Sequence, residues 1–116
     1  MQLQLYGKGI WVFKSHVDFR CGIDGLCHLI QAQSRNPQGG IYIFYNRKKD
    51  KIKCLSWHKN GFAMIYKRLE KELFHFNFKK ESGIAEIKED ELSWLLAGLE
   101  WQKMRGWKEL KYDKFD

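Results

Sequence analysis

The sequence predicts a single α+β domain in which two principal helices pack on a mainly antiparallel sheet. Apolar runs bounded by turn residues indicate several strands, and two separate stretches with helical spacing indicate the helices. The chain has 116 residues, of which 44% are hydrophobic, so it is long enough to bury one core. We expect the domain to span residues 1–101 and residues 102–116 to form a C-terminal extension, either a short helix or a loose tail.

The first third of the chain predicts two short strands followed by a helix. Residues 3–5 and 10–13 have strand composition, and a Gly-Lys-Gly turn separates them. Apolar side chains then recur at the spacing of one buried helical stripe, formed by Ile23, Leu26, Cys27 and Ile30. The turn residues at 36–40 end this helix. Gly22 and Gly25 predict an irregular first turn, because glycine lowers helix propensity.

The middle of the chain predicts a three-stranded meander over about residues 41–69. Apolar and aromatic residues at 41–45 and 51–57 flank a basic tip. A second turn follows at Asn60-Gly61. Because this dipeptide favours the positive backbone dihedrals of a type I′ hairpin, residues 62–69 should return antiparallel to the preceding strand.

Two further strands and a second helix are predicted after the meander. Phe74, Phe76 and Phe78 alternate with polar residues at a period of two, which is typical of a strand, and residues 84–87 supply another. A second helical stripe follows, formed by Leu92, Leu95, Leu96 and Leu99. The acidic residues 89–91 lie where negative charge favours the N-terminus of that helix.

Cysteine usage and hydropathy predict a cytoplasmic location without a membrane partner. No stretch of about 18 uncharged apolar residues exists, and the N-terminus lacks the pattern of a signal peptide. The three cysteines are an odd number without C-x-x-C spacing. Reduced thiols in a cytoplasm therefore fit better than a disulfide framework.

The net charge of +7 is concentrated in one part of the chain. Residues 47–80 carry eleven basic and three acidic side chains, whereas residues 81–116 carry six basic and nine acidic ones. Such a field attracts polyanions, nucleic acid first and anionic membrane second. The alternative is a solvated face that only keeps the protein soluble. Aromatic residues interleave with these charges, which favours the polyanion interpretation.

Catalytic motifs are largely missing from the sequence, so we expect no enzyme, no bound metal and no cofactor. A metal site built from His16, Cys21, Cys27 or His28 would match no common zinc spacing, and core thiols with surface imidazoles explain these residues better. Asp18 and Asp24 would make a carboxylate pair for Mg²⁺, but helix capping explains them more simply. The glycine-rich segments also lack the P-loop pattern.

The basic tip of the meander is the strongest local hypothesis for function, because it has five basic side chains and one acid within residues 47–53. A two-stranded ribbon fits the DNA major groove, and flexible Lys and Arg side chains at its tip would contact phosphates. The candidate DNA-binding residues are Arg20, Arg47, Lys48, Lys49, Lys51, Lys53, Lys67 and Arg68. An alternative role for these lysines stays open, because lysines on an exposed strand edge also prevent aggregation without binding a ligand. The function of the nearby aromatic residues is open as well, since they form either a base-stacking platform or the apolar face of the sheet.

Several ordered blocks of the sequence resemble the small accessory protein of insertion sequence 66 elements. This is the TnpB type, the product of the second open reading frame, and it is distinct from the RNA-guided nuclease that shares the name. The resemblance covers about residues 10–101. The blocks are Asp18-Phe19-Arg20, Gly22-Ile23-Asp24-Gly25-Leu26, residues 44–53, Trp57, Asn60-Gly61-Phe62, Lys67-Arg68-Leu69-Glu70 and residues 95–101. The chain departs from the family pattern at Cys21, His58-Lys59 and Phe78.

The resemblance implies a bacterial mobile-element protein that assists transposition beside a separate transposase, with no established catalytic activity. The first hypothesis is that it binds DNA, either the element ends or the target, through the basic residues above. The second is that it is an interaction module that docks the element-encoded transposase. In that case aromatic anchors such as Trp57 and Trp101 would matter more than the lysines.

Overall fold

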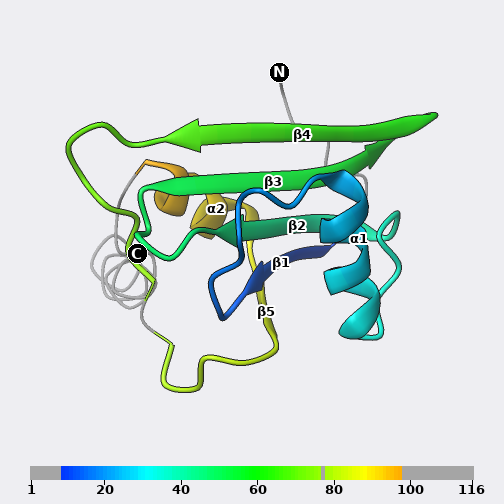
Figure 1. The fold of residues 1–116 in the computed structure, drawn as a ribbon, viewed down its shortest axis with the longest axis horizontal. Helices are drawn as coiled ribbons and strands as arrows, with labels where there is room; N and C mark the ends of the chain where they lie inside the picture. The colour runs from blue at the N-terminus through cyan, green and yellow to red at the C-terminus, as the bar shows by residue number, and fades with distance from the viewer. Residues whose placement is uncertain (1–8, 77, 98–116) are drawn as a thin grey trace, which may run out of the picture.

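A computed structural model describes residues 9–76 and 78–97. Within them, five strands form one sheet in the order β4-β3-β2-β1-β5, and two helices accompany it (Figure 1). The elements are β1 (Gly9–Phe13), α1 (Ile23–Ala32), β2 (Gly40–Tyr45), β3 (Lys51–His58), β4 (Gly61–Arg68), β5 (Ile84–Ile87) and α2 (Glu89–Leu96). The predicted α+β class with a mostly antiparallel sheet is confirmed.

The centre of the sheet is a parallel pair, while all its other neighbours are antiparallel. β1 pairs with β2 in a register that matches Ile10 to Ile41, and α1 makes the crossover between these two strands. The consecutive strands β2, β3 and β4 are antiparallel neighbours, as the meander pattern predicts. β5 runs antiparallel to β1 on the other side. The sequence did not reveal the parallel pair, because apolar alternation identifies a strand but not its partner.

Two apolar layers lie on opposite faces of the sheet. On one face, Leu26 and Ile30 of α1 pack with Tyr42, Phe44 and Leu55. On the other face, apolar side chains of β1, β2 and β3 pack with Leu92 and Leu95 of α2. All six residues of β2 are buried, because this central strand is covered on both faces. We name the two sides the α1 face and the α2 face.

The structure corrects three details of the predicted elements. Phe74, Phe76 and Phe78 lie outside the five strands of the sheet. Phe74 and Phe76 are buried and Phe78 packs against the same core, so the alternation reflects packing on the core rather than pairing in the sheet. The loop between β3 and β4 consists of Lys59 and Asn60, with φ of 55° at Lys59, so Gly61 already belongs to the strand. α1 is regular from Ile23, without the irregular first turn expected from its glycines.

Some predicted features lie outside the described residues. These are the strand at residues 3–5, Leu99 of the second helical stripe, Trp101 and the extension at 102–116. Within the described part, β1 and β5 match the strands predicted at residues 10–13 and 84–87, and α2 begins with the acidic residues 89–91.

Candidate nucleic-acid interface

The turn between β2 and β3 is built by side-chain hydrogen bonds that leave two cations exposed. The Asn46 side-chain amide donates to Asp50 Oδ1 over 2.6 Å, and the Lys51 backbone N–H donates to Asn46 Oδ1 over 3.0 Å. The hydrogen bond from Asn46 is the main cause of the lowered pKa of Asp50. This bracing holds the turn closed while Arg47 and Lys48 remain exposed to solvent. Lys48 Nζ lies 4.0 Å from Asp50 Oδ2, yet its side chain keeps 77% of its exposure.

The same turn is anchored to the segment after β4, so it does not project as a free ribbon. The Phe74 N–H donates to the Lys49 carbonyl over 2.7 Å, and the Leu69 N–H donates to the Asp50 carbonyl over 2.8 Å. Lys49 has a positive φ of 65°, and its ammonium lies 3.4 Å from the Phe76 carbonyl, to which it donates. Lys49 is therefore occupied within the fold, and the geometry does not favour the groove-inserting ribbon.

Lys53 fastens the loop between β1 and α1 onto the sheet. Its ammonium donates to the carbonyls of Phe19 and Cys21 over 2.9 and 3.1 Å, and lies 4.7 Å from the centre of the Phe19 ring. Only 7% of Lys53 is exposed. The Val17 N–H donates to the Tyr45 carbonyl over 2.9 Å and fixes the same loop at the end of β2. Lys53 is thus a structural residue of the site and has no surface to offer a ligand.

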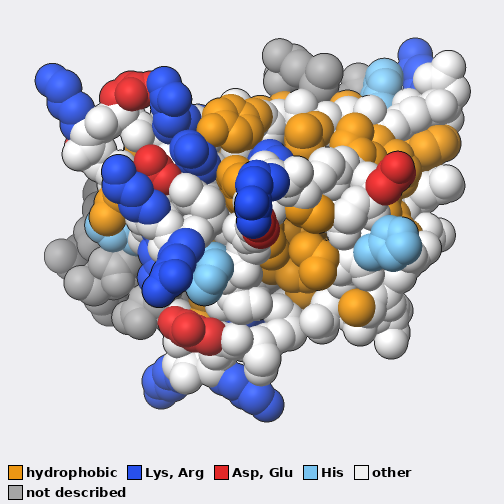
Figure 2. Space-filling model, in the orientation of Figure 1, with side chains coloured by type: hydrophobic (Ala, Val, Ile, Leu, Met, Phe, Trp, Pro, Cys, Tyr) orange, Lys and Arg blue, Asp and Glu red, His pale blue; other side chains and the backbone are white. Residues whose placement is uncertain are grey.

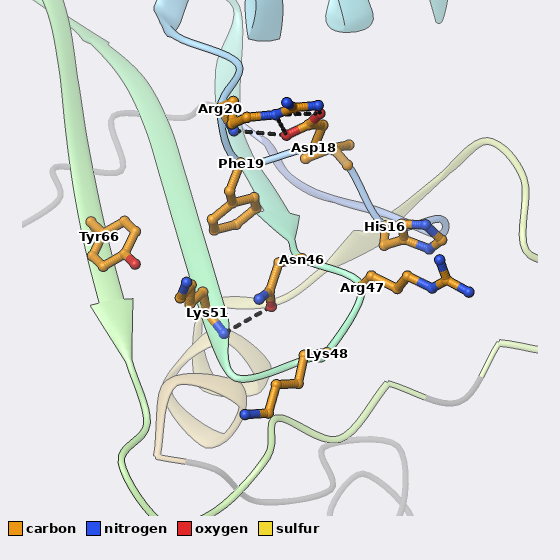
Figure 3. A pocket seen from close by; sticks show the side chains of 10 residues that line it. His16, Asp18, Phe19, Arg20, Asn46, Arg47, Lys48, Lys51 and Tyr66 are labelled. Atoms are coloured by element: carbon orange, nitrogen blue, oxygen red, sulfur yellow. Dashed lines mark hydrogen bonds and ion pairs between the residues drawn. The ribbon is translucent and has the colours of Figure 1, made fainter.

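The braced turn and the fastened loop border an open hollow of about 760 Å³ (Figure 3). Its wall includes Tyr66 of β4 and three of the candidate DNA-binding residues at or near the tip, Arg47, Lys48 and Lys51. The lining residues are His16, Val17, Asp18, Phe19, Arg20, Asn46, Arg47, Lys48, Lys51 and Tyr66. Segments that are far apart in the sequence therefore form one surface at the end of the sheet.

Arg20 and Asp18 form a two-pronged ion pair at the rim of this hollow. Arg20 Nη2 donates to Asp18 Oδ2 over 2.6 Å, and Nε donates to both carboxylate oxygens over 3.0 and 3.1 Å. The Arg20 hydrogen bonds lower the pKa of Asp18 to about 2. The ion pair is neutral overall, so the excess positive charge of the hollow comes from Arg47, Lys48 and Lys51, while the Arg20 side chain remains 92% exposed. Arg20, Arg47, Lys48 and Lys51 are the four cations that we call the basic rim.

The remaining candidate residues are not among those that line the hollow. The Lys67 ammonium donates to the Leu96 carbonyl at the C-terminal end of α2. Arg68 is the cross-strand partner of Lys51 but pairs with Glu70 over 3.0 Å. Trp57 packs edge-on against Phe62, with ring centres 5.0 Å apart, near the opposite end of β3. Trp101 lies outside the described residues.

Positive charge gathers at the end of the molecule that carries the basic rim. Figure 2 shows Lys and Arg side chains on the side where the β2–β3 turn and the end of β4 lie in Figure 1. Hydrophobic side chains lie instead along β3 and β4 toward the other end of the sheet. Within residues 9–76 and 78–97, no group of three or more His, Cys, Asp and Glu side chains is placed to hold a metal, and no helix is long and apolar enough to cross a membrane.

Comparison with known proteins identifies the family. The family model described as IS66 Orf2 like protein matches residues 8–106, which is most of the chain. The chain belongs to this family. The insertion-sequence accessory protein anticipated from the sequence blocks is thereby confirmed as a family assignment, and the match extends past Trp101, where the resemblance had been expected to stop.

Two curated relatives of this IS66 Orf2-like chain come from Sinorhizobium fredii (strain NBRC 101917 / NGR234). Uncharacterized protein y4jC is 34% identical over 101 residues, covering 85% of this chain and 86% of the relative. Uncharacterized protein y4hO is 30% identical over 95 residues, covering 80% and 82%. No solved structure matches the chain. The blocks of residues 18–20 and 44–53, which carry the sequence resemblance, contribute most of the hollow.

Proposed function

We propose that this IS66 Orf2-like protein is a non-enzymatic accessory factor of transposition that binds DNA through the basic rim. The observation that carries the proposal is the convergence of Arg20, Arg47, Lys48 and Lys51 on one hollow from two loops and the start of β3. The lining acid, Asp18, is already paired with Arg20. A phosphate at this rim therefore meets a net positive field.

Phosphate contact, rather than reading of base edges, is the binding mode that fits the rim. The β2–β3 turn is tied to the segment after β4 through Lys49 and Asp50, so it presents cations at a surface instead of entering a groove. Arg and Lys contacts to phosphate position a protein on DNA without specifying sequence. We expect binding with low sequence preference and with affinity that falls steeply as salt rises.

The test is a fluorescence anisotropy titration of labelled duplexes at two salt concentrations. One duplex carries the terminal repeats of the element and a second carries the same bases scrambled. Lys48→Glu should weaken binding at least several-fold and reduce the slope of log K against log salt by about 1 or more, because at least one phosphate contact is lost. The matched control is Lys59→Glu, an identical charge reversal at the turn between β3 and β4, the opposite end of β3.

The two variants separate a localised site from bulk charge. Unchanged affinity in Lys59→Glu together with loss in Lys48→Glu supports the basic rim. Equal losses in both would mean that only net charge matters, and no loss in Lys48→Glu would remove the rim from DNA binding. Tight binding of both duplexes with equal affinity is the expected result for phosphate contact.

A second candidate function is docking of the element-encoded transposase, and one observation favours it. Trp57, Phe62 and Met64 are only partly buried on the α1 face, toward the end of the sheet away from the basic rim. Aromatic side chains in such positions are common anchors at protein interfaces. Co-purification of the tagged transposase, with and without nuclease treatment, tests this. Association that survives nuclease and is lost in Trp57→Ala supports docking, whereas association only in the presence of DNA contradicts it.

A further inference from the structure

The hollow that carries the basic rim also has an exposed aromatic wall. Tyr66 on β4 keeps 49% of its surface exposed, a high value for an aromatic residue in a strand, and it lines the hollow. Its ring centre lies 6.3 Å from that of Phe19, with the two rings tilted by 57°. In Figure 3, Tyr66 and Phe19 lie on one side of the space, and Arg47 and Lys48 lie on the other.

The lysine that fastens the loop also contacts one ring of the aromatic wall. Lys53 opposes Tyr66 across the β3–β4 ladder, and its ammonium lies over the Phe19 ring at 4.7 Å. The wall therefore consists of two neighbouring rings, of which Phe19 also contacts a buried ammonium.

Contacts between the cations and DNA phosphates do not involve the rings of Tyr66 and Phe19. The bases of an intact duplex have both faces stacked on their neighbours, so they cannot offer a π-face to Tyr66. A base of a single strand can, while its flanking phosphates meet the cations opposite. Cationic grooves combined with exposed aromatic rings are the arrangement by which proteins bind single-stranded nucleic acid. The volume of about 760 Å³ is also within the range of sites that hold a small organic molecule such as a nucleotide.

We propose that the hollow binds an unpaired nucleotide of single-stranded DNA, with its base against Tyr66 and its phosphates at Arg47 and Lys48. The inference rests on the proposed function, because it uses the same basic rim, and it adds a preference for unpaired over paired DNA. Base stacking was one of two alternatives that the sequence left open for the aromatic residues from Tyr42 to Tyr66, and the inference assigns that role to Tyr66, which is exposed. Base stacking tolerates every base, so the site should show little sequence preference.

The experiment measures the affinity of the full chain for a labelled oligothymidine of about 16 nucleotides and for a duplex of the same length. The wild-type chain should bind the single strand more tightly than the duplex. Tyr66→Ala should weaken binding of the single strand about tenfold and leave duplex binding within about twofold, while Tyr66→Phe should keep wild-type affinity for both, because the ring is retained.

The matched control is Leu73→Ala, which removes another exposed apolar side chain, 46% exposed, that does not line the hollow. It should change neither affinity. Urea unfolding of each variant verifies that the fold is intact. Tyr66→Phe provides a second route, since a loss of single-strand affinity in this nearly isosteric variant would overturn the stacking role.

Failure of the inference can be told apart from failure of the proposed function. If Lys48→Glu weakens duplex binding but Tyr66→Ala leaves oligothymidine binding unchanged, DNA binding stands and the unpaired-nucleotide site is wrong. Equal losses of single-strand and duplex affinity in Tyr66→Ala would also overturn it. If the wild-type chain binds neither DNA at low salt, the proposed function itself fails and the inference falls with it.

Discussion

Lys53 shows how a buried residue can support the loop that forms part of the candidate site. Its side chain lies on the α1 face of β3, and its ammonium meets two loop carbonyls and the Phe19 ring. Because burying a charge costs free energy unless it is hydrogen-bonded, these contacts are what make a lysine tolerable there. Its role in positioning the loop that carries Asp18 and Arg20 follows from this geometry.

Replacement of Lys53 by methionine should therefore destabilise the fold more than the same change at Lys51. Lys53→Met keeps the apolar stem but leaves the Phe19 and Cys21 carbonyls without their donor, at a cost of about 1–3 kcal/mol in the free energy of unfolding. Lys51→Met, at a half-buried position on the same face of the same strand, should change it by less than about 0.5 kcal/mol. Urea unfolding measures both, and equal effects would contradict the bracing role.

Cys54 gives the protein a predictable response to alkaline pH. Burial raises the pKa of this thiol from 9.0 to about 12. Above pH 9 the unfolded chain releases the proton while the folded chain retains it, so the free energy of unfolding falls as pH rises toward 12. The contribution between pH 9 and pH 10 is about 1 kcal/mol. Burial together with Asp24 also raises the pKa of Cys27, which acts in the same direction.

A comparison of slopes isolates this effect. Cys54→Ala should lower stability at neutral pH, because it leaves a cavity in the α2 layer, but should flatten the decline between pH 9 and pH 10. Urea unfolding at several pH values measures both quantities. An unchanged slope in Cys54→Ala would show that other groups set the alkaline response.

At the scale of the element, α1 depends on a close approach between its first turn and the preceding loop. A Cβ atom added at Gly25 would collide with the Cys21 sulfur, although it would lie 3.6 Å from the Cys21 Cβ. Gly25→Ala should therefore cost about 0.5–1.5 kcal/mol in the wild-type chain, because the Cys21 sulfur has to leave its present rotamer. In a Cys21→Ala background the same change should instead gain about 0.5–1 kcal/mol, because alanine is the better helix former. A double-mutant cycle by urea unfolding measures this coupling, and additive effects would contradict it.

Elements with strong local patterns were predictable from the sequence, and those set by distant contacts were not. The stripe containing Leu26 and Ile30 identified α1, and turn residues separated β2, β3 and β4. In contrast, the alternation of Phe74 and Phe76 indicated a strand, but hydrogen bonds to the β2–β3 turn hold that segment instead. The expected irregular first turn of α1 was wrong: the helix is regular from Ile23, since a low glycine propensity is only a weak preference that tertiary context overrides.

The candidate site was only partly predictable, for the same reason. Charge counting placed Arg47 and Lys48 at the tip, and both side chains are exposed there. It did not show that Lys53 is buried, that Lys49 reaches the Phe76 carbonyl or that Lys67 is on the α2 face. Arg20 and Tyr66 lie on the same hollow as Arg47 and Lys48 because the loop between β1 and α1 packs over β3, and the sequence does not show this packing. Strand alternation predicts that Lys51, Lys53 and Leu55 share a face, but not that a loop will cover the second of them.

At the scale of the whole molecule, the two ends of the meander differ in character. The β2–β3 end carries the basic rim, and the β3–β4 end carries Trp57 and Phe62. β3 has eight residues, so the two ends are about 25 Å apart. If both proposals hold, this separation would let DNA and a protein partner bind at the same time without competing for one surface. A method that reports on each segment of the chain can therefore distinguish contact at the basic rim from contact at the end with Trp57 and Phe62.

Hydrogen–deuterium exchange with and without DNA should reveal which end is occupied. Amides of residues 15–20 and 46–51 should gain protection when DNA binds, because they border the basic rim. Peptides covering 58–61 should exchange at the same rate in both states, since that turn lies at the other end of β3. Those peptides serve as the internal control. Protection confined to residues 57–64 would instead assign DNA to the aromatic end and contradict the basic rim as the interface, whereas protection at residues 15–20 without residues 46–51 would exclude Arg47 and Lys48 from the contact.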